Sequence, residues 1–228
     1  TDVIRALQKA DPFGLLGSLV VSPYVRLVAL DVKRRSLTRR QIIEEHFHTT
    51  GLPVGHGFSD TNRKNGTAYY YFDVGAVRHV VMDSVNPNGY ADGSLDQTQF
   101  NWLKATISGT KNKAVIVYSH HTSDTMNNPL ILTGGDPQLP RVLGGSVLEF
   151  LLSQRHVIAW VNGHTHNNKI TARKRADGTG GFWEINTASH IDYPQQARII
   201  EIADNADGTW SIFTTVEWIS CSLTTKMK

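Results

Sequence analysis

Two short apolar runs, each followed closely by a pair of histidines, constrain the fold of this chain more than any other feature. The first run spans residues 114–118 and leads into Ser-His-His, and the second spans residues 156–161 and leads into Asn-Gly-His-Thr-His. Because neither run alternates with polar residues, both are predicted to be strands buried on both faces. A helix capped by Ser146 is predicted between them, over residues 147–154. This alternation predicts a layered α/β fold, whose β-rich C-terminal part forms or extends a second sheet.

The other elements are predicted from periodicity and from turn residues. Helices are expected over residues 37–49 and 95–107, the second with a capping box at Ser94. The glycine-rich segment 51–66 and the long segment 122–145 are expected to be loops. Strands are expected over residues 25–30, 67–72, 77–82, 169–173, 181–186, 197–202 and 208–216.

Length and composition point to one domain over residues 1–228. Hydrophobic residues make up 40% of the chain and charged residues 19%, which is typical of a soluble globular protein. No run of 18 apolar residues exists, so no membrane span is predicted. The net charge of +3 mildly favours phosphate-bearing substrates. It indicates no specificity for nucleic acid, which usually requires a clustered basic face.

The histidines that follow the two apolar strands are candidate metal ligands. Strand ends in α/β folds gather such side chains, because rigid strands fix the position and the following loops supply the side chains. Imidazole nitrogens suit divalent ions such as zinc, iron, manganese or nickel. His164 and His166 are two residues apart, so their rings share one face of an extended strand, or diverge towards two adjacent ions if the chain turns there. Two histidine pairs at successive strand ends therefore predict a metal site.

Together these motifs resemble those of the calcineurin-like metallophosphoesterase superfamily. The resemblance rests on the Ser-His-His of residues 119–121 and the Gly-His-Thr-His of residues 163–166. Residues 53–58 and 194–198 are more narrowly similar to a subgroup of predicted actinobacterial metallophosphoesterases, which suggests an exported protein. The resemblance extends over about residues 25–216. A lead-in similar to that of the family precedes the histidines, with Met82-Asp83, Gly93-Ser94-Leu95-Asp96, Gln99 and Trp102-Leu103.

Membership of this superfamily implies hydrolysis of phosphoester bonds at a centre of two divalent metal ions, such as manganese, iron or zinc. On the matching positions, His120 and His164 would bind one ion and His166 the other. His121 would support the ligands from behind or contact the substrate as a catalytic residue, and a structural hydrogen bond to a carboxylate is an equally good interpretation. The implied fold is a β-sandwich flanked by helices, of which this chain holds the C-terminal part.

The chain departs from the superfamily because it lacks three earlier motifs. No D-x-H, G-D-x-x-D or G-N-H occurs, and these motifs supply a bridging aspartate and further ligands. Three neutral imidazoles do not offset the charge of two divalent ions, which a bridging carboxylate would hold about 3.5–4 Å apart. We therefore expect an incomplete domain with little activity alone. A preceding segment or a partner chain would have to carry the three motifs.

Two further histidines are candidate substrate-binding residues. His56 lies between two glycines, and it either reaches the site from its loop or is a turn residue. His190, two residues before Asp192, either lines the substrate pocket or belongs to the ordinary surface.

Two other functions stay open on the sequence. In one, the chain is a non-catalytic fragment or binding module that associates with a partner chain, which the absent motifs favour. In the other, it is a mononuclear zinc hydrolase, in which three histidines bind one ion and leave one position open. Metal stoichiometry and self-association distinguish these functions from a two-metal centre.

Overall fold

The α/β fold class is confirmed by the computed structural model, which describes residues 37–132 and 139–218. The helices are α3 (Arg39–His48), α4 (Asp60–Asn65), α5 (Gln97–Ser108) and α6 (Gly144–Ser153). The strands are β1 (Tyr70–Val74), β2 (Val77–Val81), β3 (Ala114–Tyr118), β4 (Val157–Asn162), β5 (Lys169–Lys174), β6 (Gly181–Asn186), β7 (Gln196–Asp204) and β8 (Trp210–Trp218). The strand predicted over residues 25–30 lies outside the described residues.

One sheet of six strands carries the candidate site. Its order is β1-β2-β3-β4-β6-β5, and β7 and β8 form a separate two-stranded sheet. Within the larger sheet β2, β3, β4 and β6 run parallel to one another, and the edge strands β1 and β5 pair antiparallel with β2 and β6. The carboxyl ends of the four parallel strands therefore lie along one edge of the sheet, where α/β folds place their ligands.

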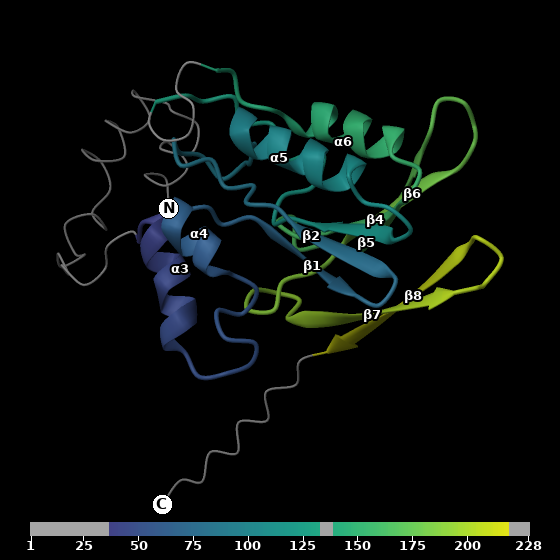
Figure 1. Cartoon of the computed structure of the whole chain (residues 1–228), viewed down its shortest axis with the longest axis horizontal. Helices are drawn as coiled ribbons and strands as arrows, with labels where there is room; N and C mark the ends of the chain where they lie inside the picture. The colour runs from purple at the N-terminus through teal and green to yellow at the C-terminus, as the bar shows by residue number, and fades with distance from the viewer. Residues whose placement is uncertain (1–36, 133–138, 219–228) are drawn as a thin grey trace, which may run out of the picture.

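The six-stranded sheet separates two hydrophobic cores (Figure 1). On one face α5 and α6 cover the sheet, and Leu103 of α5 clusters with Trp160 of β4, both fully buried. On the other face Ile116 of β3 clusters with Ile212 of the β7–β8 hairpin. Helices on one face and a second small sheet on the other make a layered arrangement. Within the described ranges, none of the helices is long and apolar enough to cross a bilayer.

The N-terminal cap of α5 was predicted at the wrong residue. Asp96, not Ser94, caps the helix. The hydroxyl of Ser94 instead accepts a hydrogen bond from Nε of Arg141 at 3.0 Å, and Leu95 pairs with Val142 in an isolated β-bridge. The chain is therefore still extended at Leu95, because a tertiary contact with a segment over forty residues away overrides the local capping pattern.

A short helix interrupts the segment predicted to be a loop over residues 51–66. It begins after Ser59, which forms a reciprocal capping box with Asn62, and it ends at Gly66 in the left-handed conformation (φ 66°). Six residues are too few to show a helical hydrophobic period. The Ser59–Asn62 pair was therefore the sequence feature that could have indicated this helix.

The predicted helix 147–154 begins three residues early. Its N-cap is Leu143, which makes no side-chain cap hydrogen bond, so the predicted Ser146 cap is wrong. Gly144 starts the helix against the backbone of Ser123, and a Cβ at this position would overlap the Ser123 carbonyl group. The absence of a side chain at Gly144 therefore lets α6 approach the loop that follows the first histidine pair.

Shortening Leu103 to alanine tests the helix-covered core. Leu103 is fully buried, so L103A should lower the free energy of unfolding by about 2–5 kcal/mol through lost burial and a residual cavity. Urea unfolding followed by circular dichroism measures the change. Leu132 is 69% exposed, and L132A should change stability by less than about 0.5 kcal/mol. Equal losses in the two variants would contradict this packing.

Candidate metal centre

His120 and His164 meet at the carboxyl ends of β3 and β4. Nε2 of His120 lies 3.1 Å from Nδ1 of His164. The backbone N–H of Gly163 donates to the carbonyl oxygen of His120 at 2.9 Å, which extends the strand pairing into both loops. Two nitrogen ligands that bind one zinc-type ion at 2.0–2.1 Å lie roughly 3 Å from each other. The separation of these two nitrogens therefore fits two ligands of a single ion.

His121 is buried behind this pair and is held at both ring nitrogens. A carbonyl oxygen only accepts, so Nε2 carries the hydrogen that is donated to the oxygen of Ala91 at 2.8 Å. Nδ1 then accepts from the hydroxyl of Ser84 at 2.8 Å. Burial lowers the pKa of His121 to about 4, because the charged imidazolium is poorly solvated there. His121 is thus a neutral ring whose partners are a hydroxyl and a backbone carbonyl, not a carboxylate.

Gly93 provides the space that His121 occupies. A Cβ at Gly93 would overlap the imidazole ring and would lie 2.5 Å from the carbonyl oxygen of Ser84. Glycine is therefore required here by a close approach rather than by an unusual backbone conformation. Any larger residue would displace His121, whose ring lies 4.8 Å from that of His120 and 4.6 Å from that of His164 between centroids.

Asp92 lies next to the second nitrogen of His164. Its Oδ1 is 3.4 Å from Nε2 of His164, while Nδ1 of the same ring faces His120. Histidines that bind metal usually present their other nitrogen to a carboxylate or carbonyl, which fixes the ring and its tautomer. Partial burial is the main cause that lowers the pKa of His120, and the nearby rings of His164 and His166 lower it further. The lowered pKa keeps the ring of His120 neutral and able to bind a cation.

The chain turns at the second histidine pair and does not continue as a strand. His164 and His166 both adopt left-handed backbone conformations, with φ of 69° and 56°, and Thr165 donates its hydroxyl hydrogen to Asn186 at 2.6 Å. His164 contacts His120, whereas Nδ1 of His166 lies 3.9 Å from a carboxylate oxygen of Asp192. In the described residues, the ligand atoms that lie within 4.8 Å of one another belong to His120, His121 and His164.

A cavity of about 480 Å³ opens above these residues. His190 lines it but His56 does not, so the structure separates the two candidate substrate-binding residues. His56 has a left-handed backbone at a turn (φ 51°), and its ring contacts that of His46 on α3. The lining comes from the ends of the parallel strands and the loops after them, with His120, His164, His166, His190, Ser119 and Thr187 among its members.

Several residues that shape the centre were not identified from the sequence. Ser84 and Asp92 lie in the segment that connects β2 to α5. Ser84 forms a hydrogen bond with His121, which is 37 residues away in the sequence. Gly93 fell within the family-like lead-in but had no assigned role. Turn-forming residues surround all three, so composition predicts only a loop there. Nothing in the local pattern indicates that this loop packs against the histidines.

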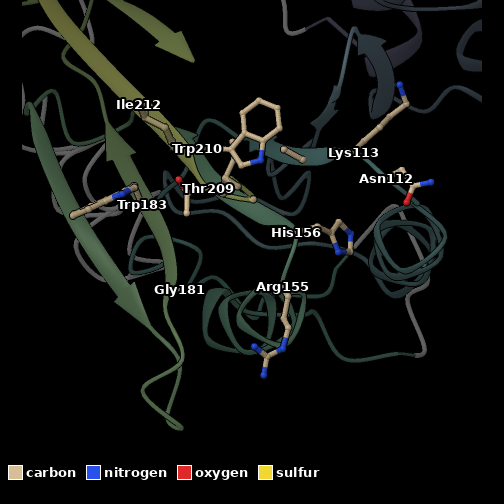
Figure 2. A pocket seen from close by; sticks show the side chains of 12 residues that line it. Asn112, Lys113, Arg155, His156, Gly181, Trp183, Thr209, Trp210 and Ile212 are labelled. Carbon is tan, nitrogen blue, oxygen red and sulfur yellow. The ribbon is translucent and has the colours of Figure 1, made fainter. Parts of the chain in front are cut away.

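A second cavity, of about 540 Å³, lies at the amino ends of the same strands, and Trp210 is among the residues that line it. Figure 2 shows the side chain of Arg155 extending away from Trp210. Nζ of Lys113 donates to the carbonyl oxygen of Gly75 at 2.8 Å, and Arg155 contacts Asp177 at 3.7 Å. Both cations have protein partners, so no charged groups converge among the described residues that line this cavity, in contrast to the histidine cavity.

Comparisons with known proteins relate the chain to solved structures only. No family model matches the chain, and no curated protein sequence matches it. It is similar in structure to a dimetal phosphatase from Danio rerio, with 16% identity and a TM-score of 0.47, over 70% of this chain and 59% of that protein. It is also similar to the sulfate thiohydrolase SoxB of Thermus thermophilus in complex with glycerol, with 13% identity and a TM-score of 0.36, over 64% of this chain and 24% of that protein. The chain thus spans less than two thirds of either protein.

Protonation of His121 should make the metal-free protein lose stability in acid. Its pKa is about 4 in the folded protein and about 6.5 in an unfolded chain, so the unfolded state binds more protons between these values. Its contribution to stability is complete above pH ~6.5 and is lost as the pH falls towards ~4. Unfolding free energies measured in the presence of a chelator should therefore decline over this range.

The control for this pH dependence is His121→Asn, which removes the titrating ring. The variant should be less stable at neutral pH and should show a shallower decline between pH 6.5 and 4. Parallel pH profiles for the two proteins would show that His121 does not titrate as its burial requires.

Proposed function

We propose that this chain contributes metal ligands to a two-metal centre that hydrolyses phosphoester bonds. The observation that carries the proposal is the 3.1 Å approach of His120 Nε2 to His164 Nδ1 beside a cavity of about 480 Å³. The Ser-His-His and Gly-His-Thr-His motifs, which resemble those of calcineurin-like metallophosphoesterases, supply the reason for choosing a phosphoester as the substrate.

The residues present supply two ligands for one divalent ion and one candidate ligand for a second ion. His120 and His164 supply two imidazole nitrogens at a separation that fits two ligands of one ion. His166, with Asp192 nearby, is the proposed start of the second site. Imidazoles alone leave the charge of two divalent cations uncompensated, so the proposal includes carboxylates from a further segment or a partner chain that carries the D-x-H, G-D-x-x-D and G-N-H motifs.

Each residue of the centre has a distinct proposed role. His120 and His164 bind the first ion, and Asp92 holds the ring of His164 in the orientation that directs Nδ1 at the ion. His121 supports the pair from behind as a neutral ring, and His190, which is exposed on the cavity wall, contacts the substrate. Bound divalent ions supply the chemistry, since they lower the pKa of water and neutralise charge on phosphoryl oxygens.

A mononuclear zinc hydrolase is the second candidate, because three histidines lie together. Ligand atoms of His120, His121 and His164 are within 4.8 Å of one another, and three imidazoles plus an open position form a known type of catalytic zinc site. For this function His121 would have to give up its hydrogen bond to Ser84. The hydrogen bonds at both of its nitrogens favour the supporting role instead.

Removal of either proposed ligand should largely abolish the metal binding of the chain. H120A and H164A should each weaken Mn²⁺ or Zn²⁺ binding by more than ~100-fold. That is the largest loss of affinity typical of mutations at residues that only orient a ligand. Isothermal titration calorimetry measures the affinity, and elemental analysis counts the bound ions. Hydrolysis of bis-p-nitrophenyl phosphate by the isolated chain should be slow, and a chelator should abolish it.

The matched control is H48A, because His48 is a histidine of α3 whose side chain is 67% exposed. It should keep the affinity and the slow turnover of the original chain. Stoichiometry separates the candidates: one ion with full activity supports the mononuclear enzyme, whereas activity that rises when the missing motifs are supplied on a second chain supports the two-metal centre. If the original chain binds no ion, the proposed function is wrong and a non-catalytic binding module remains.

A further inference from the structure

We infer that Glu184 of β6 is a positioning residue that fixes the distance between the two histidine loops. The inference rests on the proposed function, because it assigns Glu184 a part in holding the metal ligands. Glu184 is 3% exposed and is not among the residues that line the histidine cavity. It acts through the hydrogen bonds that its carboxylate accepts from residues beside the histidines.

One carboxylate group joins the two loops. Its Oε1 accepts from the backbone N–H of Ser123 and from Nδ2 of Asn162, each at 2.8 Å. Ser123 follows the His120–His121 pair, and Asn162 is the last residue of β4, two residues before His164. Both loops therefore bind to the same oxygen atom, and their separation is set by the geometry of that atom.

The second oxygen and a neighbouring arginine complete the network. Oε2 accepts from the hydroxyl of Ser123 at 2.8 Å and from Nε of Arg173 at 2.6 Å. Nη2 of Arg173 also donates to the Ser123 hydroxyl at 2.6 Å. Four donors, one of them from an arginine that also pairs with Asp124 at 3.3 Å, thus compensate a carboxylate that would otherwise be costly to bury. The Ser123 side chain is held from two directions.

Asn186, on the same face of β6, extends the network to the second histidine pair. Its Nδ2 donates to Oδ1 of Asn162 at 3.0 Å and to the carbonyl oxygen of Gly163. Its own Oδ1 accepts from Thr165, the residue between His164 and His166. Glu184 and Asn186 therefore hold the Gly-His-Thr-His turn from the strand beside it.

The placement of this network indicates a positioning role more than a contribution to overall stability. Replacing buried ion pairs by apolar groups is often neutral or stabilising, so a buried pair is weak evidence for stability. Here the donors from Ser123 and Asn162 come from the two loops that carry the proposed ligands. Residues that orient metal ligands from behind typically change metal affinity by about 10–100-fold when they are altered.

The test compares E184Q with a control variant in the full chain. Glutamine keeps the size and shape of Glu184 but replaces an acceptor oxygen with an NH₂ group that faces hydrogen-bond donors. Asp73 offers the matched control, since it forms a bidentate ion pair with Arg78 at 2.8 and 3.0 Å in the β1–β2 hairpin, away from the histidine edge. Mn²⁺ or Zn²⁺ affinity is measured by calorimetry at a temperature where all proteins are folded.

The expected result is a loss of affinity of about 10–100-fold in E184Q, with D73N within about twofold of the original chain. The visible spectrum of bound Co²⁺ should also shift in E184Q and not in D73N, which a purely structural role would not produce. If E184Q fails to fold, S123A provides the test, because it removes one donor on the His120 side and should weaken binding while D73N does not.

Two outcomes overturn the inference in distinguishable ways. If the original chain binds the ion and E184Q, or S123A in its place, binds equally well, Glu184 does not position the ligands although the proposed function stands. If the original chain binds neither Mn²⁺ nor Zn²⁺, the proposed function fails, and the positioning role fails with it.

Discussion

The parallel pairing of β3 with β4 is the interaction on which the candidate centre depends. Val117 lies opposite Trp160 and Tyr118 opposite Val161, so the two strands end side by side at one edge of the sheet. A shift of one residue would turn every side chain of a strand to the opposite face. The register is fixed because both faces are buried, one under α5 and α6 and the other under the β7–β8 hairpin. The apolar core therefore determines where the histidines meet.

Hydrogen bonds among polar residues at the carboxyl ends of β3, β4 and β6 fix the positions of the two loops that carry the histidines. His121 is held by Ser84 and Ala91, and the second histidine turn is held from β6. Buried polar groups are costly unless they are satisfied, so these hydrogen bonds have few alternative arrangements. His120 and His164 are left open to the cavity, with nitrogens that face each other. The hydrogen-bonded residues hold the histidine loops in place, and the cavity leaves the nitrogens of His120 and His164 accessible to an ion. Such a site suits metal binding.

The sequence predicted the parts of this arrangement that depend on local pattern. The strands β3 and β4 were predicted correctly, because burial on both faces leaves a clear signature. A helix between them was also predicted correctly, although its start and its cap were not, and the ligand role of the histidines stays a prediction. The Ser94 cap, the α4 helix and the proximity of Asp92 to His164 were not predicted correctly, because each is decided by a tertiary contact or by too short a segment. Glu184 did leave a signal, a single carboxylate inside the otherwise apolar run Phe182-Trp183-Glu184-Ile185. A charge in a buried strand requires partners, and here they are Arg173 of β5 together with Ser123 and Asn162 beside the two histidine pairs.

The most direct test of the centre is a crystal structure of the chain soaked with Zn²⁺, with anomalous scattering used to locate the ion. Convergence of His120 and His164 predicts an anomalous peak about 2.0–2.1 Å from Nε2 of the first ring and Nδ1 of the second, beside the cavity at the ends of β3 and β4. A fully occupied zinc position elsewhere, with these two nitrogens unligated, would contradict the proposal that they share one ion.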